Sequence, residues 1–204
     1  MGQYYSPTII YPDQSISSVY SHDYGVGLKL MEHAWIGNEL VNAVYARIYN
    51  KPRKVAWIGD YSNDEYETCG EAYTRQVDHK FFKKCYKSAW GDKNRIPKSR
   101  FSDEELNLVS HDTHYKYLVN HSKKEYLDLD SYVKRCTVKG GNWDGYCVNP
   151  LPLLTACGNG RGGGDFFKGS VGYDNVGIWA FDELELADMA PEEYVEQDYN
   201  FFEK

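Results

Sequence analysis

A glycine-rich segment at residues 158–165 is the part of the sequence best suited to hold a ligand. Five glycines follow an apolar run at 151–154, and only Asn159 and Arg161 interrupt them. Backbone N–H groups left bare by glycine, next to a guanidinium, can cradle an anion. The residues that we expect to contact such a ligand are Asn159, Gly160, Arg161, Gly162, Gly163, Gly164 and Asp165.

Known phosphate-binding motifs do not explain this segment. It lacks the Gly-Lys-Ser/Thr ending of a P-loop. The spacing Gly158-x-Gly160-x-x-Gly163 fits the letters of a dinucleotide-binding turn, but the sequence predicts neither the required strand before it nor a helix after it. A tight structural connection accounts for the glycines equally well.

A Trp-x-x-Asp pattern occurs twice, at Trp57–Asp60 and at Trp179–Asp182, each time after a predicted short strand. Two indole faces and two carboxylates beside a cleft would stack on a flat ring and bind hydroxyl groups. Tyr61 adds a further ring at the first copy. Burial in the core, with each aspartate capping a turn, is the alternative interpretation, because tryptophan is mostly buried.

His33 is the remaining candidate for acid–base chemistry, since it follows an apolar helical stretch near a predicted turn. A hydrolase or transferase would use His33, Asp60 or Asp182 as general acid–base. A histidine satisfied within the core is the alternative. The sequence around 111–114 contains two histidines, but no ligands converge there at zinc-site spacing. We therefore expect no metal site and no cofactor.

These residues must be positioned by a chain that mixes strand-like and helical patterns. We expect an α+β fold in which a mostly antiparallel sheet is built from two related halves, because the segments around the two Trp-x-x-Asp patterns resemble each other. Pro7 predicts an edge or a bulge for the first strand. Predicted strands or hairpins are 4–11, 54–58, 114–129 and 176–186, and predicted helices are 28–35 and 39–49, with a capped start at 102–106. We divide the single domain into a first half at 1–64, a helical insertion at 65–112, a second half at 113–190 and a C-terminal tail at 191–204.

Composition narrows the classes of partner. The 204 residues carry 30 acidic and 23 basic side chains, for a net charge of −7. The basic residues form only small clusters, at 51–54 and 80–87, so we expect no nucleic-acid partner. Tyrosine is abundant, at 19 residues, and suits ligand walls and wet interfaces as well as strands.

The cysteines and the hydropathy pattern bear on location. Five cysteines without a Cys-x-x-Cys pair favour reduced thiols. The sequence contains no apolar run of membrane-spanning length and no signal peptide. We expect a cytoplasmic protein without a membrane partner.

Five blocks of the chain, in order, resemble a protein family encoded by Gram-positive gut bacteria and by their phages or other mobile elements. The resemblance covers most of the chain apart from about 61–110 and implies a bacterial or viral cytosol. No activity is assigned to that family, so the resemblance transfers no catalytic role. The blocks are residues 1–5 (MGQYY), 24–35 (including GLKLMEHAW), 55–61 (VAWIGDY), 117–126 and 159–165 (NGRGGGD).

The leading prediction from these features is a binding protein that sequesters a small anionic, nucleotide-like ligand at the glycine-rich segment. The first alternative is a protein–protein inhibitor of a host factor, acting through an acidic, tyrosine-rich surface. The second alternative is a hydrolase or transferase in a cleft between the halves. Whether any reaction is catalysed stays open at this point.

Overall fold

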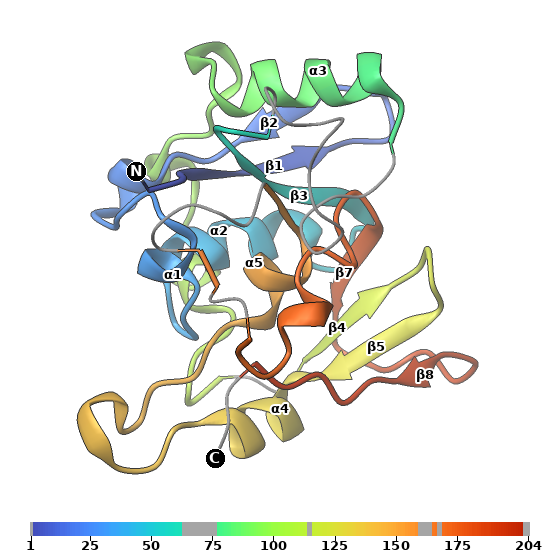
Figure 1. Cartoon of the computed structure of the whole chain (residues 1–204). Coiled ribbons are helices and arrows are strands. Elements are labelled where there is room, and N and C mark those ends of the chain that lie inside the picture. Colours follow the sequence, from blue (N-terminus) through green and yellow to red (C-terminus); the bar gives the residue numbers. More distant parts are fainter. Residues whose placement is uncertain (1, 63–76, 114–115, 159–164, 167–168, 202–204) are drawn as a thin grey trace.

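A mixed, mostly antiparallel sheet forms the centre of the protein (Figure 1). The computed structural model describes residues 2–62, 77–113, 116–158, 165–166 and 169–201. Within these residues the sheet has eight strands in the order β2-β1-β3-β7-β4-β5-β8, and β6 is a further partner of β3. The strands are β1 (Tyr5–Ile10), β2 (Ile16–Ser18), β3 (Arg53–Gly59), β4 (Tyr117–Asn120), β5 (Glu125–Asp128), β6 (Ala156–Cys157), β7 (Glu183–Ala187) and β8 (Val195–Glu196).

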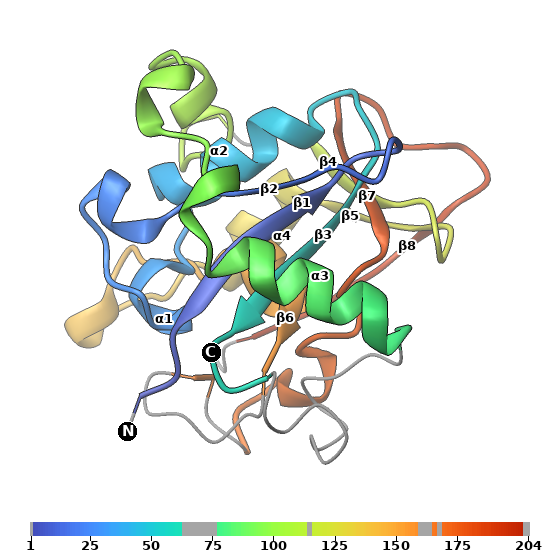
Figure 2. The same cartoon turned by 90° about the horizontal axis from the view of Figure 1, so that it is seen from above.

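Helices lie on both faces of the sheet. Figures 1 and 2 show α3 across one face of β1, β2 and β3, and α1, α2 and α5 against the other. The predicted α+β class is therefore confirmed. The helices are α1 (Leu30–His33), α2 (Glu39–Ile48), α3 (His79–Ala89), α4 (Leu129–Cys136) and α5 (Pro150–Leu154).

The sheet divides the apolar core into two clusters, one on each of its faces, and β3 contributes to both. Val55 and Trp57 belong to the larger cluster with α2, and Ala56 and Ile58 belong to the smaller cluster under α3. This division follows from the strand itself, because successive side chains point to opposite faces of a sheet. All four residues are fully buried.

Helix α3 is the main helix of the region predicted as an insertion. Asp78 caps its first turn, since Oδ1 accepts from the Phe81 N–H at 2.9 Å. Its last turn is fixed by the sheet, because Ser6 Oγ donates to the Ala89 carbonyl at 2.9 Å. The predicted capping at 102–106 is also present, with Ser102 and Glu105 bonded reciprocally, but it begins only a single 3₁₀ turn (Glu105–Asn107).

Strand β1 is not the edge or bulged strand that Pro7 predicts. It lies between β2 and β3, and Pro7 is paired with Trp57. The Pro7 carbonyl accepts from the Val19 N–H at 3.3 Å, on the side away from β3. The N–H and C=O of a strand residue point the same way. The N–H that proline lacks would therefore face the side where β2 has already ended, so no bond to β3 is lost.

The strand predicted at 176–186 is shorter and starts later. Residues 176–181 form turns, and β7 begins only at Glu183. Positive φ angles at Gly177 (78°) and Phe181 (64°) interrupt the extended backbone. Trp57 therefore lies within a strand and Trp179 within a turn, so the two Trp-x-x-Asp patterns do not occupy equivalent positions. The fold does not show the predicted internal duplication.

Candidate functional site

The glycine-rich segment begins at an edge of the sheet where two parallel strands end together. Strands β3 and β6 run parallel, with Trp57 paired to Ala156 and Ile58 to Cys157. Their carboxyl ends therefore meet, as Figure 2 shows. Asp60 and Tyr61 follow the end of β3, and Gly158 follows β6 directly.

Two glycines allow these strand ends to touch. A Cβ atom on Gly59 would overlap the Gln3 side chain and press on the Gly158 backbone, and one on Gly158 would overlap the Tyr5 hydroxyl. Tyr5 is completely buried and donates to Gln3 Oε1 at 2.9 Å. Part of the glycine signal in the sequence therefore reflects close packing against Gln3 and Tyr5.

Adding a methyl group at Gly158 tests this packing. We expect Gly158→Ala to lower the free energy of unfolding by about 1–3 kcal/mol, because the new Cβ has no room. Tyr5→Phe removes the overlapping hydroxyl and frees Gln3 to move. The loss in the Gly158→Ala/Tyr5→Phe double variant should therefore be smaller than the sum of the two single losses, as measured by urea unfolding. Additive losses would show that the overlap does not determine the glycine.

The side chains at this edge are mostly tyrosines and one carboxylate. Tyr4 is 42% exposed, and Asp60 and Tyr61 are half-buried. The Tyr4 N–H donates to Asp60 Oδ1 at 3.0 Å, and the Tyr86 hydroxyl donates to the Asp60 carbonyl at 2.7 Å. Burial raises the pKa of the Asp60 carboxyl, and the bond from Tyr4 opposes that rise. The edge thus offers aromatic faces and a hydrogen-bond acceptor.

Most of the predicted loop residues lie outside the described part of the chain. Gly158 and Asp165 are the described residues on either side of the undescribed stretch, and Asp165 is half-buried. The predicted contacts that lie outside the described residues are Asn159, Gly160, Arg161, Gly162, Gly163 and Gly164.

His33 and Trp57 form a buried pair beneath this edge. The Trp57 Nε1–H donates to His33 Nε2 at 3.0 Å, and His33 Nδ1 lies 3.1 Å from the Gly27 carbonyl. This network assigns the proton to Nδ1, which donates to Gly27. Burial lowers the pKa of His33 to about 4, so the ring is neutral at pH 7. Both ring nitrogens are occupied and neither side chain is exposed. His33 is thus not placed as a general base, and Trp57 cannot stack on a ligand.

The depressed pKa of His33 predicts a pH-dependent stability. An unfolded histidine takes up a proton near pH 6.5, whereas folded His33 does so only near 4. The unfolded state therefore binds more protons in between, and stability falls as the pH drops from about 6.5 towards 4, by on the order of 3 kcal/mol. His33→Gln should be less stable at neutral pH but lose less over this range in urea unfolding.

The exposed His111 provides the control for this experiment. His111→Gln should keep the wild-type dependence on pH. Equal slopes for wild type and His33→Gln would contradict the assignment of the effect to His33.

Trp179 and Asp182 are held elsewhere in the structure. The Trp179 indole is buried and donates to Glu125 Oε2 at 3.2 Å. Asp182 is buried and accepts from Asn120 Nδ2 at 2.9 Å. The Asp182 carbonyl accepts from the Val55 N–H, whereas Asp60 follows the far end of β3, five residues along the chain. At the rise per residue of a strand, five residues separate Asp60 from the position of Asp182 by roughly 16 Å.

The structure therefore does not bring the predicted acid–base residues together. His33 bonds to Trp57, Asp60 to Tyr4, and Asp182 to Asn120. The hydrolase or transferase hypothesis placed one or more of them as a general acid–base in a cleft between the halves, and His33 and Asp182 are buried. What the structure does gather is Asp60, Tyr61 and the start of the glycine-rich segment.

Gln3 and Tyr5 are members of this site that the sequence did not single out. Their sequence signals were their place at or just before the start of the predicted strand 4–11 and within the block at residues 1–5. Pairing between Tyr5 of β1 and Gly59 of β3, 54 residues apart, and between Trp57 of β3 and Ala156 of β6, 99 residues apart, brings them to the glycines. No local pattern encodes such a contact.

Comparison of the chain with models of protein families, with curated proteins and with solved structures gives no match in any of the three. In the described ranges, no helix has the length and apolar character needed to cross a membrane. A search of the same residues for three or more clustered His, Cys, Asp or Glu side chains that could hold a metal finds none.

Proposed function

We propose that this protein binds a small anionic, nucleotide-like ligand at the edge where β3 and β6 end. One observation carries the proposal. The contact between Gly59 and Gly158 starts the glycine-rich segment beside Asp60 and Tyr61. The start of the segment that we propose binds the anion therefore lies beside two side chains suited to the rest of a nucleotide.

Each group has a distinct role in this proposal. The glycine N–H groups and Arg161 neutralise the anion, because backbone donors and a guanidinium both suit phosphate or carboxylate. The exposed ring of Tyr4 or the half-buried ring of Tyr61 stacks on a base. The Asp60 carboxylate accepts from ligand hydroxyl groups. Trp57 supports the edge from within the core and makes no contact with the ligand.

A cytoplasmic setting is part of the proposal. The described cysteines, at 85, 136, 147 and 157, are buried thiols rather than disulfides. Burial raises the pKa of Cys85 and of Cys147 to about 12, so both stay protonated. Reduced thiols are typical of the cytosol.

A thermal-shift titration against a panel of nucleotides tests the ligand site. Ligand at about 100 times its dissociation constant should stabilise the protein by about 2.7 kcal/mol. Arg161→Ala should lose most of this stabilisation, because its guanidinium balances the ligand's charge. Arg100→Ala removes an equal charge from an exposed 3₁₀ turn (Lys98–Arg100) and should respond as the wild type does. No shift with any nucleotide, or an unchanged shift in Arg161→Ala, would argue against the site.

The acidic C-terminal region favours a second candidate function, inhibition of a host protein that has a basic surface. From Asp182 onwards the sequence contains nine acidic residues and one lysine. Apolar side chains lie exposed among the charges, since Met189 is 81% and Val195 is 62% exposed. Val195 belongs to β8, the last strand of the sheet. Mixed charge and apolar surface is typical of protein interfaces. The resemblance to proteins of phages and mobile elements supports a host target.

Charge reversal at Glu192 and Glu193, both exposed, tests this second candidate. Glu192→Lys/Glu193→Lys should fail to capture from bacterial lysate a partner that the wild type captures at low salt. The matched control Asp103→Lys/Glu104→Lys, at another exposed position, should still capture it. Salt near 0.5 M should release the partner, since screening then acts within roughly 4 Å. Absence of any captured protein at low salt would count against this function.

A further inference from the structure

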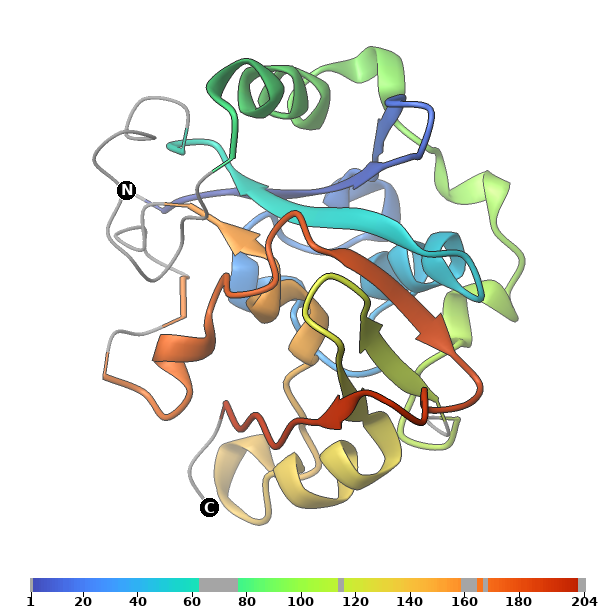
Figure 3. The same ribbon diagram turned by 90° about the vertical axis from the view of Figure 1, so that its right-hand side faces the viewer.

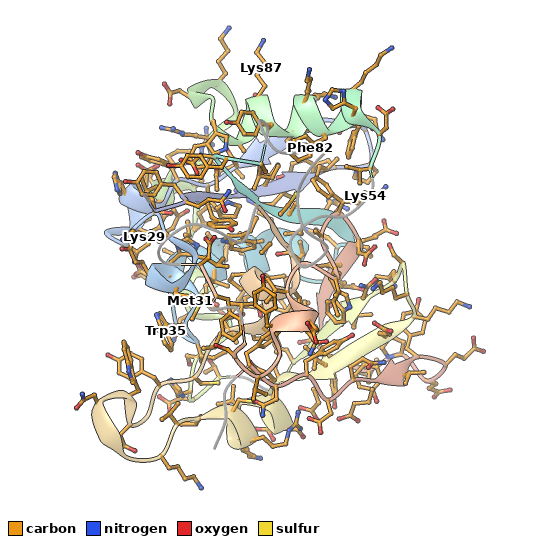
Figure 4. The ribbon with its side chains drawn as sticks, viewed as in Figure 1. Lys29, Met31, Trp35, Lys54, Phe82 and Lys87 are labelled. Carbon is orange, nitrogen blue, oxygen red and sulfur yellow. The ribbon has the colours of Figure 1, made fainter. Side chains whose placement is uncertain are left out.

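The exposed face of α3 is a stripe of lysines. Lys80, Lys83, Lys84 and Lys87 recur at helical spacing and are all exposed. The opposite face is apolar and packs on the sheet. Figure 4 shows Lys87 pointing away from the sheet and Phe82 towards it. One face of α3 therefore packs in the core, and the other lies exposed at the surface.

This arrangement of charge does not help α3 to fold. The helix itself contains no acidic residue, and Asp78, which caps its first turn, is followed closely by Lys80. A cation near a helix N-terminus opposes the macrodipole, and like charges three or four residues apart repel each other. Only Lys87, in the last turn, is favourably placed. Local rules broken without a gain in stability are expected at functional sites.

Several basic residues elsewhere in the described part of the chain are paired with carboxylates. Such pairs include Lys29–Glu32, Arg95–Asp92, Lys98–Glu39, Lys116–Asp188, Lys134–Asp130 and Arg135–Asp198. Within the described part of the chain, no ion pair is formed by the α3 lysines, and Lys84 Nζ donates instead to the Gln14 carbonyl at 2.6 Å. Among the described residues, a chain of net charge −7 thus presents four exposed lysines on one face of α3 without a carboxylate partner.

A groove runs along the C-terminal half of this stripe. Its volume is about 790 Å³, and its walls are α3, the turn between β1 and β2, and residues 91–94. Lys84, Lys87 and Lys93 line it together with Ser15, Ser88 and Asn94. The one acidic lining residue, Asp92, is neutralised by Arg95 at 2.7 Å. Ligand pockets commonly have volumes of about 300–1,000 Å³.

We propose that this groove binds a compact polyanion carrying two or more phosphate groups. Three lysines supply separate point charges, which suits several phosphates better than one. Ser15 Oγ donates to Asp13 Oδ1 at 2.6 Å and Asn94 Nδ2 donates to Ser88 Oγ at 3.0 Å, so the lysine ammonium groups, with three donors each, are the groups that would bind phosphate oxygens. The volume fits a small ligand rather than a duplex or a folded domain. This site lies over α3 and uses none of the residues assigned to the edge of β3 and β6, so it goes beyond the function proposed above.

Calorimetric titration of the full chain with inorganic tripolyphosphate at low ionic strength tests the groove. Wild type should bind with an affinity that falls as salt is added, because the lysines are exposed. Lys84→Gln/Lys87→Gln should bind at least about tenfold more weakly, a change of about 1.4 kcal/mol. Lys124→Gln/Lys139→Gln removes the same charge from two exposed positions on other elements and should bind as the wild type does. Arg161→Ala should also bind normally, which separates this site from the edge of β3 and β6.

Other outcomes would overturn the proposal. They are absence of binding at low salt, or an equal loss of affinity in the Lys124→Gln/Lys139→Gln control. Tighter binding of a ten-residue single-stranded oligonucleotide than of tripolyphosphate would assign the stripe to nucleic acid. Binding of polyglutamate alone would assign it to an acidic protein segment.

Lys80→Glu tests the premise that the stripe costs stability. Replacing a first-turn cation by an anion should raise the midpoint of thermal unfolding by roughly 1–3 °C without ligand. A lowered midpoint would show that the lysine has a structural role and would contradict the premise.

Discussion

Strand β3 is buried on both faces from Val55 to Ile58, and the rest of the structure is arranged around this requirement. One face needs α2 and its neighbours as a cover, and the other needs α3. Along its edges β3 pairs with β1 on one side, and with β7 and then β6 on the other. The strand also carries Gly59 to the point where the chain must approach Gly158 closely. The candidate ligand edge is thus a consequence of how the centre of the sheet is packed.

Burial decides the role of most side chains in this chain that could take part in acid–base or ligand-binding chemistry. His33 is neutral and bonded at both ring nitrogens, and Asp182 accepts from Asn120 inside the core. A polar group in such surroundings must be hydrogen-bonded, because leaving it unpaired costs on the order of 1–3 kcal/mol. These side chains therefore specify the packing of the core. Asp60 differs, since it lies half-buried at the end of a strand.

Charge is distributed unevenly over the two edges of the sheet. Helix α3 contacts β1 and β2 at one edge, and β8, which belongs to the acidic C-terminal region, forms the other (Figure 3). The excess of acidic residues from Asp182 onwards accounts for the whole net charge of −7. The remainder of the chain is close to neutral, so the lysines of α3 are not surrounded by a uniformly negative protein. With this distribution, the lysine face of α3 attracts anions and the acidic C-terminal region attracts cations.

The sequence by itself determined the α+β class, the helix that Asn38 caps, the hairpin of β4 and β5, and the close approach at Gly158. These features depend on local preferences: periodicity, capping residues and the backbone freedom of glycine. Only the tertiary structure decided that β1 is an interior strand, that Trp179 lies in a turn, and that His33 bonds to Trp57. It also joined Gly59 to Gly158 and separated Asp60 from Asp182 along β3. Each of these outcomes depends on pairing between segments distant in the chain, and burial and long-range register are set by that pairing and by no local pattern.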